Sequence, residues 1–337
     1  MHTSLALSAI LGAILTVCGV AVSRALLTAM NTPAEVLEDA VLYMRLYFGG
    51  VLFSVVYNMA AGILNAAGNS QRSLIYLGCA SITNIILDLV LIAGLRMGVE
   101  GAAIATDISQ LVSCILSLRF LMRVEDDYRV TLRKIRPDAK MSARIIRVGL
   151  PTGIQNMVIS FSNVLVQSSV NGYGAVAMAG FAAYMKIDGF NILPVMSFSM
   201  AVTTFTGQNY GAGKIDRVKK GMKFGCLCSV LMAEVVGATI YAASPWLIGA
   251  FSREADVIAF GVRQAHTITL FYCLLAFSHA IASVCRGAGK AFVPMTIMLG
   301  VWCVFRIFYI TLMMQWRHEI IYVYWAYPIT WAISSVI

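Results

Sequence analysis

Long apolar runs alternate with short polar or charged stretches along the whole sequence. Most runs reach the roughly 20 residues that a helix needs to cross the hydrocarbon core of a membrane. None shows the alternation of about ten residues that is typical of a membrane β-strand. The pattern predicts ten membrane-spanning helices, the last cut short at Ile337, at about 4–29, 42–67, 73–95, 101–122, 146–171, 176–206, 221–243, 258–285, 291–314 and 319–337.

The composition agrees with this pattern. Apolar residues make up 59% of the chain and charged residues only 12%, with a mean hydropathy of +0.80, whereas soluble domains are nearer to a quarter charged. The sequence therefore predicts an all-α integral membrane protein. The net charge of +9 reflects Lys and Arg residues gathered in alternate loops, as membrane topology requires, and does not indicate a nucleic-acid partner.

The charged stretches divide the chain into two lobes. We expect an incomplete N-terminal lobe of four helices over 1–122, a cytoplasmic basic linker over 123–145 and a C-terminal lobe of six helices over 146–337. The segment 30–41 carries Pro33 and three acidic residues, so we expect a surface loop there. Cations cluster near residue 72 and over 123–147, 214–223 and 286–290, which places these loops and both chain ends in the cytoplasm.

An internal repeat relates the two ends of the chain. The segment Leu64-Asn-Ala-Ala-Gly-Asn69 after the second span matches Cys285-Arg-Gly-Ala-Gly-Lys290 after the eighth, and Gly289 follows Gly68 by 221 positions. The first four spans therefore resemble the last four, while the fifth and sixth have no partner upstream. In a protein with two lobes of six helices each, the fifth and sixth spans would have partners in the first lobe. We therefore expect two further helices ahead of Met1.

Several motifs resemble those of the multidrug and toxic compound extrusion (MATE) family. They are Gly149-Leu-Pro151, Gly207-Gln-Asn-Tyr-Gly-Ala-Gly213 with Arg217, Asn84-Ile-Ile-Leu-Asp88, Gly98-Val-Glu-Gly-Ala-Ala-Ile-Ala-Thr106 and Arg286-Gly-Ala-Gly289. The resemblance implies a twelve-helix fold of two lobes around a central cavity, with this chain carrying the third to twelfth helices. It also implies a structural role for the motif residues Pro151, Gln208, Asn209, Gly211, Ala212 and Gly289.

The chain departs from the family at the carboxylates that many members use for ion coupling. We expect the family's first two helices to be absent, including the first-helix carboxylate, and the positions of the acids in the seventh and tenth helices are occupied by Val158-Ile-Ser160 and Leu274-Leu-Ala276. The sequence therefore gives no support for ion coupling through carboxylates at those positions.

Polar residues in the fifth span form one stripe. Asn156, Ser160, Asn163, Gln167 and Asn171 are spaced four, three, four and four apart, which puts them on one helix face. Amides that face lipid would be costly, so we expect the stripe to line a water-filled cavity. The alternative is that these amides hold neighbouring helices together.

Ionisable residues inside the spans are further candidates for substrate or ion binding. Asp188 could take a proton or attract a cation, and Lys186, two positions earlier, points elsewhere on the same helix and could neutralise a carboxylate from another helix. Asp88 lies on the same helix face as Asn84. It could be a structural residue that bonds a neighbouring helix, or a cation ligand. A buried Arg306 needs a partner, for which Asp188, Asp88 and Glu234 are candidates. A structural ion pair is the alternative for each.

The resemblance and these residues together predict a secondary active multidrug exporter that works by alternating access. It would exchange organic cations or drugs for protons or sodium ions, without a cofactor or a metal, as a monomer in a bacterial plasma membrane. No phosphate-binding loop or metalloprotease motif is present, so an enzyme has no support in the sequence. Two alternatives are a lipid-linked oligosaccharide flippase of the same superfamily and a transport-incompetent fragment that acts only as a membrane scaffold.

Overall fold

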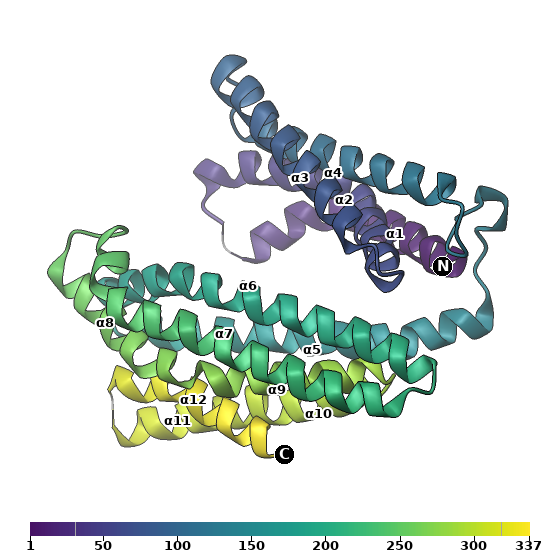
Figure 1. The fold of residues 1–337 in the computed structure, drawn as a ribbon. Coiled ribbons are helices and arrows are strands. Elements are labelled where there is room, and N and C mark those ends of the chain that lie inside the picture. Colours follow the sequence, from purple (N-terminus) through teal and green to yellow (C-terminus); the bar gives the residue numbers. More distant parts are fainter. Residues whose placement is uncertain (31, 318) are drawn as a thin grey trace. The chain divides into compact units, whose positions relative to one another are not determined.

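The chain is helical throughout the part that the computed structural model describes, which is residues 1–30, 32–317 and 319–337 (Figure 1). Each predicted span corresponds to one straight or interrupted helical rod, and the prediction of an all-α membrane protein is confirmed. In chain order the rods are α1 (His2–Ala29), α2 (Ala34–Ala66), α3 (Ser70–Asp88) with the π-helical segment η1 (Leu89–Gly94), α4 (Gly98–Arg123), α5 (Ala139–Asn171), α6 (Ala175–Gly211), α7 (Ile215–Gly249), α8 (Ala255–Ile268) with the 3₁₀ turn η3 (Thr269–Phe271) and α9 (Tyr272–Gly287), α10 (Phe292–Met298) with the π-helical segment η4 (Leu299–Phe305) and α11 (Arg306–Trp316), and α12 (Ile320–Val336).

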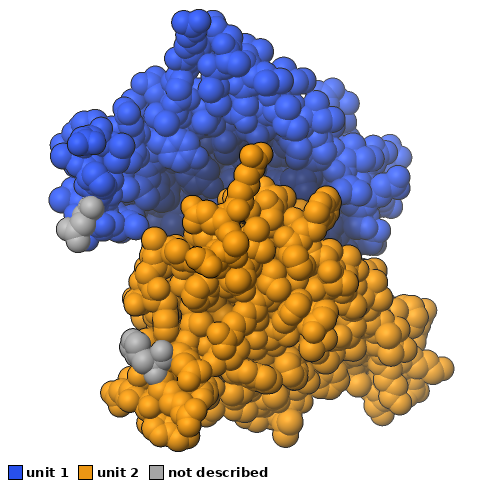
Figure 2. Space-filling view, turned by 90° about the vertical axis from the view of Figure 1, so that its left-hand side faces the viewer, with its two compact units in different colours: residues 1–145 blue, residues 146–337 orange. Residues whose placement is uncertain are grey.

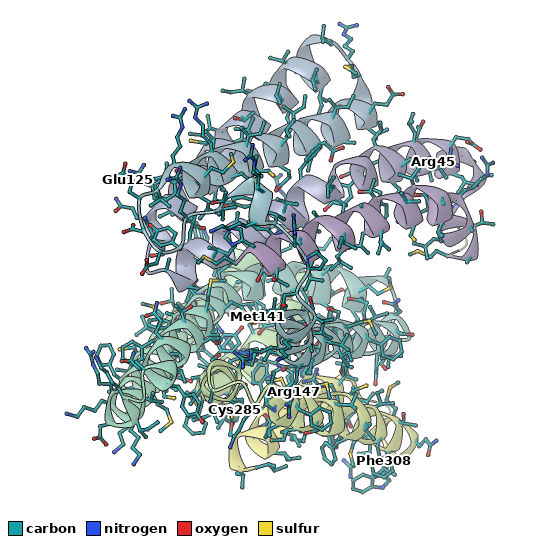
Figure 3. The ribbon with its side chains drawn as sticks, turned by 90° about the vertical axis from the view of Figure 1, so that its right-hand side faces the viewer. Arg45, Glu125, Met141, Arg147, Cys285 and Phe308 are labelled. Atoms are coloured by element: carbon teal, nitrogen blue, oxygen red, sulfur yellow. The ribbon has the colours of Figure 1, made fainter. Side chains whose placement is uncertain are left out.

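Seven of the described rods are long and apolar enough to cross a membrane by length and composition alone. The other three are α5 and α6, which carry many polar residues, and α12, which is apolar but shorter. Large apolar side chains cover the outside of the helices: Trp246 is 78% exposed, and Phe308, 63% exposed, points away from the neighbouring helices (Figure 3). Such a surface is typical of a protein whose outer face contacts lipid.

The chain divides into two compact units, residues 1–145 and 146–337, which Figure 2 colours separately. In the first unit, α2 packs between α1 and α4, and α3 packs on α4. The core of this unit is built around Tyr57, Leu64, Leu121 and Val130.

The second unit is organised around α6, which packs against α7, α8 and α9. Its core runs from α5 to α12 and includes the fully buried aromatic residues Phe181, Tyr184, Tyr272 and Tyr324. Glycines bring these helices close together: at Gly180, an added Cβ would lie 2.8 Å from the Val257 carbonyl oxygen on α8. The polar residues of α5 and α6 are thus held inside a tightly packed bundle.

The helix bounds follow the repeat that the sequence predicts. The rods Ala34–Ala66 and Ala255–Gly287 both span 33 residues and begin 221 positions apart, and the rods Ser70–Gly94 and Phe292–Trp316 both span 25 residues. Each rod of the first pair ends in the same turn. Gly68 (φ 83°) and Gly289 (φ 78°) adopt the left-handed conformation that closes a helix C-terminus, and the next backbone N–H bonds the carbonyl five residues before it.

The turn after α6 has the same form. Gly213 has φ 69°, and the Lys214 N–H bonds the Asn209 carbonyl at 2.8 Å. The motif residues Gln208, Asn209 and Gly211 form the last turn of α6, and Ala212 is its C-cap. Only glycine adopts this conformation without strain, which explains the glycines that end three helices of the described chain.

Two predicted loop segments differ from the structure. The segment 30–41 was expected to be a loop, but α2 already begins at Ala34, so its acidic residues lie on the first two turns of a helix; Asn31 lies outside the described residues. Carboxylates are favourable near a helix N-terminus, and Glu38 also pairs with Arg24 at 2.7 Å. The basic linker 123–145 likewise contains the start of α5, where Asp138 accepts the Met141 N–H at 2.8 Å.

Candidate functional site

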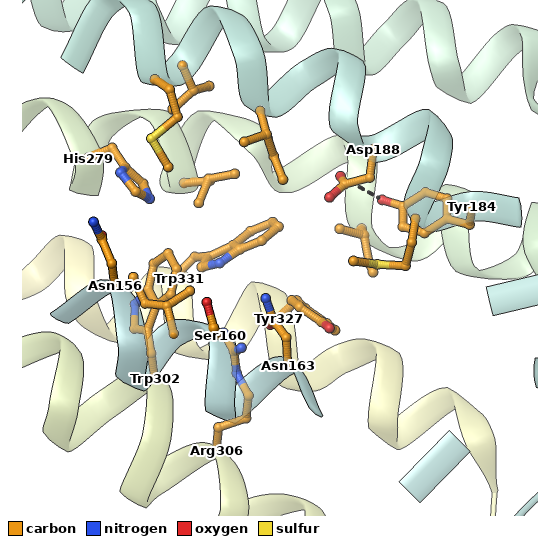
Figure 4. Close-up of a pocket in the computed structure, with 17 residues that line it drawn as sticks. Asn156, Ser160, Asn163, Tyr184, Asp188, His279, Trp302, Arg306, Tyr327 and Trp331 are labelled. Carbon is orange, nitrogen blue, oxygen red and sulfur yellow. Dashed lines mark hydrogen bonds between the residues drawn. The ribbon is translucent and has the colours of Figure 1, made fainter. Parts of the chain in front are cut away.

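A cavity of about 310 Å³ lies inside the second unit, between α5, α6, α8, α9, η4, α11 and α12 (Figure 4). Its wall is mostly apolar and aromatic, with a few polar groups. The residues that line it are Asn156, Ile159, Ser160, Asn163, Tyr184, Met185, Asp188, Ile192, Val195, Met196, Ile268, Leu275, His279, Trp302, Arg306, Tyr327 and Trp331. Ligand sites commonly combine an apolar wall with a few placed polar groups.

Asp188 supplies the carboxyl group of the cavity. Tyr184, one turn earlier on α6, donates its hydroxyl to Asp188 Oδ1 at 3.4 Å, and the Tyr272 hydroxyl from α9 donates to the same oxygen. The two tyrosine hydroxyls lie 2.9 Å apart. Within the described chain no cationic side chain lies within ion-pair distance of Asp188. The carboxyl is therefore held by neutral donors, which leaves it open to a proton or a cationic ligand.

The cost of a charged Asp188 within the membrane is comparable to the energy of its two hydrogen bonds. A charged Asp at the centre of a membrane helix costs about 3 kcal/mol, and a hydrogen bond to a charged group contributes about 1.5–3 kcal/mol. Two tyrosine donors can therefore hold an ionised Asp188 without a counter-ion, although neither state of the carboxyl is strongly favoured by these contacts alone.

Arg306 lies on another wall of the cavity and is only 1% exposed (Figure 4). It donates to Thr330 Oγ1 at 2.8 Å and to Ser162 Oγ at 3.4 Å. Its guanidinium carbon lies 4.7 Å from the ring centre of Tyr327 and 5.4 Å from that of Trp302. Hydroxyls and aromatic faces thus take the place of a carboxylate.

Two of the three candidate acidic partners of Arg306 have other contacts. Asp188 is bonded by the tyrosines, and Glu234 accepts the backbone N–H of Cys273 at 2.7 Å. The described residues contain a single ion pair, between Arg24 and Glu38, so the expectation that a carboxylate pairs with Arg306 was wrong. The sequence could not show that two aromatic rings would enclose the guanidinium.

The polar stripe on α5 is divided between two surroundings. Asn156, Ser160 and Asn163 line the cavity, whereas Gln167 bonds the next stripe residue, Asn171, at 3.0 Å and lies outside the lining. A different face of α5 holds neighbouring helices: Gln155 contacts Met298 Sδ at 2.9 Å, and Ser162 donates to the Trp302 carbonyl at 2.5 Å. Three residues of the stripe therefore line the cavity, while the interhelical contacts of this helix come from residues outside the stripe.

Two other candidates lie away from this cavity. Lys186 is exposed, and its Nζ lies 5.2 Å from the ring centre of Phe251. Asp88 belongs to the first unit, at the end of α3 and just before the π-helical segment η1, where its Oδ1 atom is buried without a hydrogen-bond partner. Lys186 is thus exposed while Asp188 lines the cavity, so the two side chains point in different directions from α6, as the sequence predicts.

Sequence reasoning missed several cavity residues. Trp302, Tyr327 and Trp331 line the cavity and come from two rods that resemble ordinary apolar spans. Tyr272, from a third such rod, is not part of the lining but bonds the lining residue Asp188. His279 is buried and also lines the cavity, with its ring centre 5.6 Å from that of Trp302. The spacing of Tyr327 and Trp331 on one helix face was a signal for an aromatic wall, whereas nothing local placed Tyr272 beside Asp188.

The fold and the cavity define a helical membrane protein of the transporter class, and comparison with known proteins gives the family. The MatE family model matches residues 1–90 and 151–312, so the chain belongs to the MatE family. Members of this family are transporters and not enzymes, and they are multi-pass proteins of the plasma membrane.

Several named relatives come from bacteria. The chain is 30% identical over 80% of its length to the probable multidrug resistance protein YpnP of Bacillus subtilis, and 26% identical over 99% to the probable multidrug resistance protein YoeA of the same organism. It is 27% identical over 81% to the probable multidrug resistance protein NorM of Thermotoga maritima. The chain covers 60% of the length of YpnP, 74% of YoeA and 60% of NorM.

Solved structures share the fold. A MOP superfamily transporter from Pyrococcus furiosus Vc1 matches with a TM-score of 0.93 at 24% identity, over 98% of this chain and 75% of that one. A multidrug resistance MATE family transporter of the MOP superfamily, in its outward-facing conformation, matches with a TM-score of 0.92 at 24% identity, over 99% of this chain and 75% of that one.

Proposed function

We propose that this chain acts as a secondary active multidrug exporter that exchanges organic cations for protons or sodium ions by alternating access. The observation that carries the proposal is the cavity of the second unit, where the Asp188 carboxyl faces amides and aromatic rings without a cationic partner within the described chain. The names of the bacterial relatives, each a probable multidrug resistance protein, support the same function.

The cavity suits a small, flat, amphipathic cation. Its volume of about 310 Å³ is at the lower end of the range for ligand pockets, about 300–1,000 Å³. A cation beside the Trp331 ring gains about 0.5–2 kcal/mol, and Asn156 and Asn163 offer amide oxygens for N–H groups of the ligand. These contacts require charge and an aromatic shape more than one defined chemical structure, which agrees with a broad range of drugs.

A single carboxyl can couple the two fluxes. If Asp188 holds either a proton or the positive charge of the drug, binding of one favours release of the other. Alternation between an inward-open and an outward-open state would then turn this competition into export. A sodium ion can replace the proton in the same scheme, with the carboxylate and amide oxygens as ligands.

The oligosaccharide flippase is less well supported. Its pyrophosphate substrate requires several cationic groups, but Lys186 is exposed outside the cavity and Arg306 is 1% exposed and bonded to Thr330 and Ser162. A wall with one enclosed guanidinium and one carboxyl fits a cationic ligand better than a doubly negative one.

Export in a bacterial host that lacks its own drug pumps tests the proposal. Cells that express the chain should accumulate less ethidium than cells with an empty vector, and Asp188→Asn should abolish the difference. Lys186→Gln is the matched control, because it removes a charge two residues away on an exposed face and should leave export unchanged. Export by Asp188→Asn at the parent rate would remove Asp188 from the mechanism. A parent chain that reaches the membrane without exporting would support the scaffold.

The same cells identify the coupling ion. Collapse of the pH gradient by a protonophore should stop export if the proton is the coupling ion. Export that persists under this treatment but requires external sodium would assign sodium instead. Export that needs neither gradient would contradict the antiport mechanism.

A further inference from the structure

The rod formed by α8 and α9 is interrupted next to the cavity. The 3₁₀ turn Thr269–Phe271 separates the two helices, and Phe271 has φ −115° and ψ 13°, outside the helical range. Neither glycine nor proline occurs in this turn. A 3₁₀ stretch within a long helix often marks a hinge or a strained site, so other elements must hold the turn in place.

The turn sets the position of a residue that contacts Asp188. Tyr272 is the first residue of α9 and is 0% exposed. Its hydroxyl donates to Asp188 Oδ1 and lies 2.9 Å from the Tyr184 hydroxyl. A change in the backbone at residue 272 would therefore move one of the two donors that hold the carboxyl.

The helix α7 holds this backbone from the other side. Glu234 Oε1 accepts the N–H of Cys273 at 2.7 Å, and this amide nitrogen is joined directly to the carbonyl carbon of Tyr272. Gly237, one turn further along α7, allows close approach: an added Cβ would lie 2.7 Å from the Thr269 carbonyl oxygen and 2.9 Å from Tyr272 Cδ2. Two residues on one face of α7 thus fix both the backbone and the ring of Tyr272.

The chemistry of Glu234 suits this role. Its carboxyl lies within the membrane-spanning helix α7, where a charge is unfavourable without compensation. Within the described chain it has no ion-pair partner, but it accepts a backbone N–H in the first turn of α9. Carboxylates are favourable at a helix N-terminus, where the backbone N–H groups carry partial positive charge.

We propose that Glu234 is a positioning residue for the cation site: its bond to the Cys273 amide holds Tyr272 where the tyrosine hydroxyl donates to Asp188. This inference rests on the proposed role of Asp188 in exchanging a proton for a cation. Without the Glu234 acceptor, the turn at 269–271 relaxes, the Tyr272 hydroxyl withdraws, and the carboxylate form of Asp188 loses a donor.

Other titratable groups near Asp188 do not share this link to Glu234. The groups that face the cavity around Asp188 are Tyr184 from α6, His279 from α9, Arg306 from α11 and Tyr327 from α12. His266 from α8 contacts Ser244 and the Tyr241 carbonyl of α7 instead. Of these groups only His279 shares α9 with Cys273, six residues further along. We therefore expect substitution of Glu234 to act on Asp188 through Tyr272, the residue whose carbonyl carbon is joined to the bonded amide.

Infrared difference spectra of the purified chain across pH test the proposal. The carbonyl band of the protonated Asp188 carboxyl is identified by its loss in Asp188→Asn, and its intensity gives the pH at which half of the carboxyl is protonated. Tyr272→Phe should move this midpoint toward alkaline pH by about one unit, a tenfold change in proton affinity, because the carboxylate loses a donor. Glu234→Ala should move it in the same direction, and Glu234→Gln, which keeps an acceptor oxygen, should restore most of the parent value.

The double variant separates positioning from a general structural effect. If Glu234 acts through Tyr272, Glu234→Ala should cause no further shift when added to Tyr272→Phe. A full additional shift would overturn the proposal, as would a parent midpoint in Glu234→Ala or in Tyr272→Phe. If Glu234→Ala does not fold, Glu234→Asp replaces it, since the shorter carboxylate keeps the charge but loses the reach.

The infrared titration measures the protonation of Asp188 in the purified chain and does not depend on whether the chain exports a drug. A failure of the proposed function would show as a parent chain that does not export, whereas a failure of this proposal shows only in the titrations.

Discussion

Asp188 and Arg306 show that opposite charges in one helix bundle need not pair. Asp188 is held by two tyrosine hydroxyls, and Arg306 by two hydroxyls and the faces of two aromatic rings. Direct pairing would neutralise both groups and leave neither for a ligand. Neutral partners stabilise each charge by a smaller amount and keep the carboxyl able to exchange its partner.

Removal of the Arg306 side chain should destabilise the second unit strongly. Arg306→Ala leaves a space between two aromatic rings and removes both hydrogen bonds, so we expect a loss of about 3 kcal/mol. The exposed Arg253→Ala on the same unit should change stability by no more than about 0.5 kcal/mol. Thermal unfolding in detergent, followed by tryptophan fluorescence, compares the two, and equal stability of both variants would show that the enclosed guanidinium contributes little.

Interrupted helices surround the cavity at the scale of single elements. Pro194 lies inside α6 between the lining residues Ile192 and Val195, and the 3₁₀ turn η3 and the π-helical segment η4 interrupt two other rods. Pro194 has no N–H, so the Phe190 carbonyl lacks its usual helical partner. Prolines in membrane helices often bend them, and a bend at this point of α6 would move one wall of the cavity.

Replacement of Pro194 should separate stability from export. A proline in a helix interior costs about 3 kcal/mol relative to alanine, so Pro194→Ala should raise the unfolding temperature and slow export by making α6 stiffer. The control is Pro245→Ala, an exposed proline near the end of α7, which should stabilise the chain without slowing export. Export by Pro194→Ala at the parent rate would contradict a gating role for this proline.

The sequence predicts elements better than it predicts their interruptions. Ten apolar runs give the rods, and the repeated Gly-Asn and Gly-Lys turns give the ends of α2 and α9, because both signals are local. The 3₁₀ turn at Thr269–Phe271 has no local breaker and depends on contacts from α7. For the same reason, the stripe on α5 predicted three lining residues, while Tyr272 could be found only from the packing of distant helices.

The position in the membrane is a property of the whole molecule. At 1.5 Å per residue, the 35 residues of α7 span about 50 Å, more than the roughly 30 Å of a hydrocarbon core. The turns at its two ends must therefore lie on opposite sides of the membrane. The basic cluster of 214–223 predicts that the Lys214 end is cytoplasmic.

Labelling of single cysteines checks this topology. In a chain whose eight cysteines are replaced, Lys214→Cys should react with a membrane-impermeant maleimide only in inverted vesicles. Glu254→Cys, beyond the other end of α7, should react only in intact cells. The reverse result would invert the assigned orientation, and reaction of both on one side would contradict a membrane-spanning α7.

Equilibrium binding of ethidium to the purified chain across pH tests the central claim most directly. If Asp188 holds either a proton or the drug cation, the affinity of the parent should fall by up to about tenfold per pH unit as the carboxyl becomes protonated. Asp188→Asn should bind weakly and with no dependence on pH, while Lys186→Gln should follow the parent. Binding by Asp188→Asn with the affinity and the pH dependence of the parent would contradict the account.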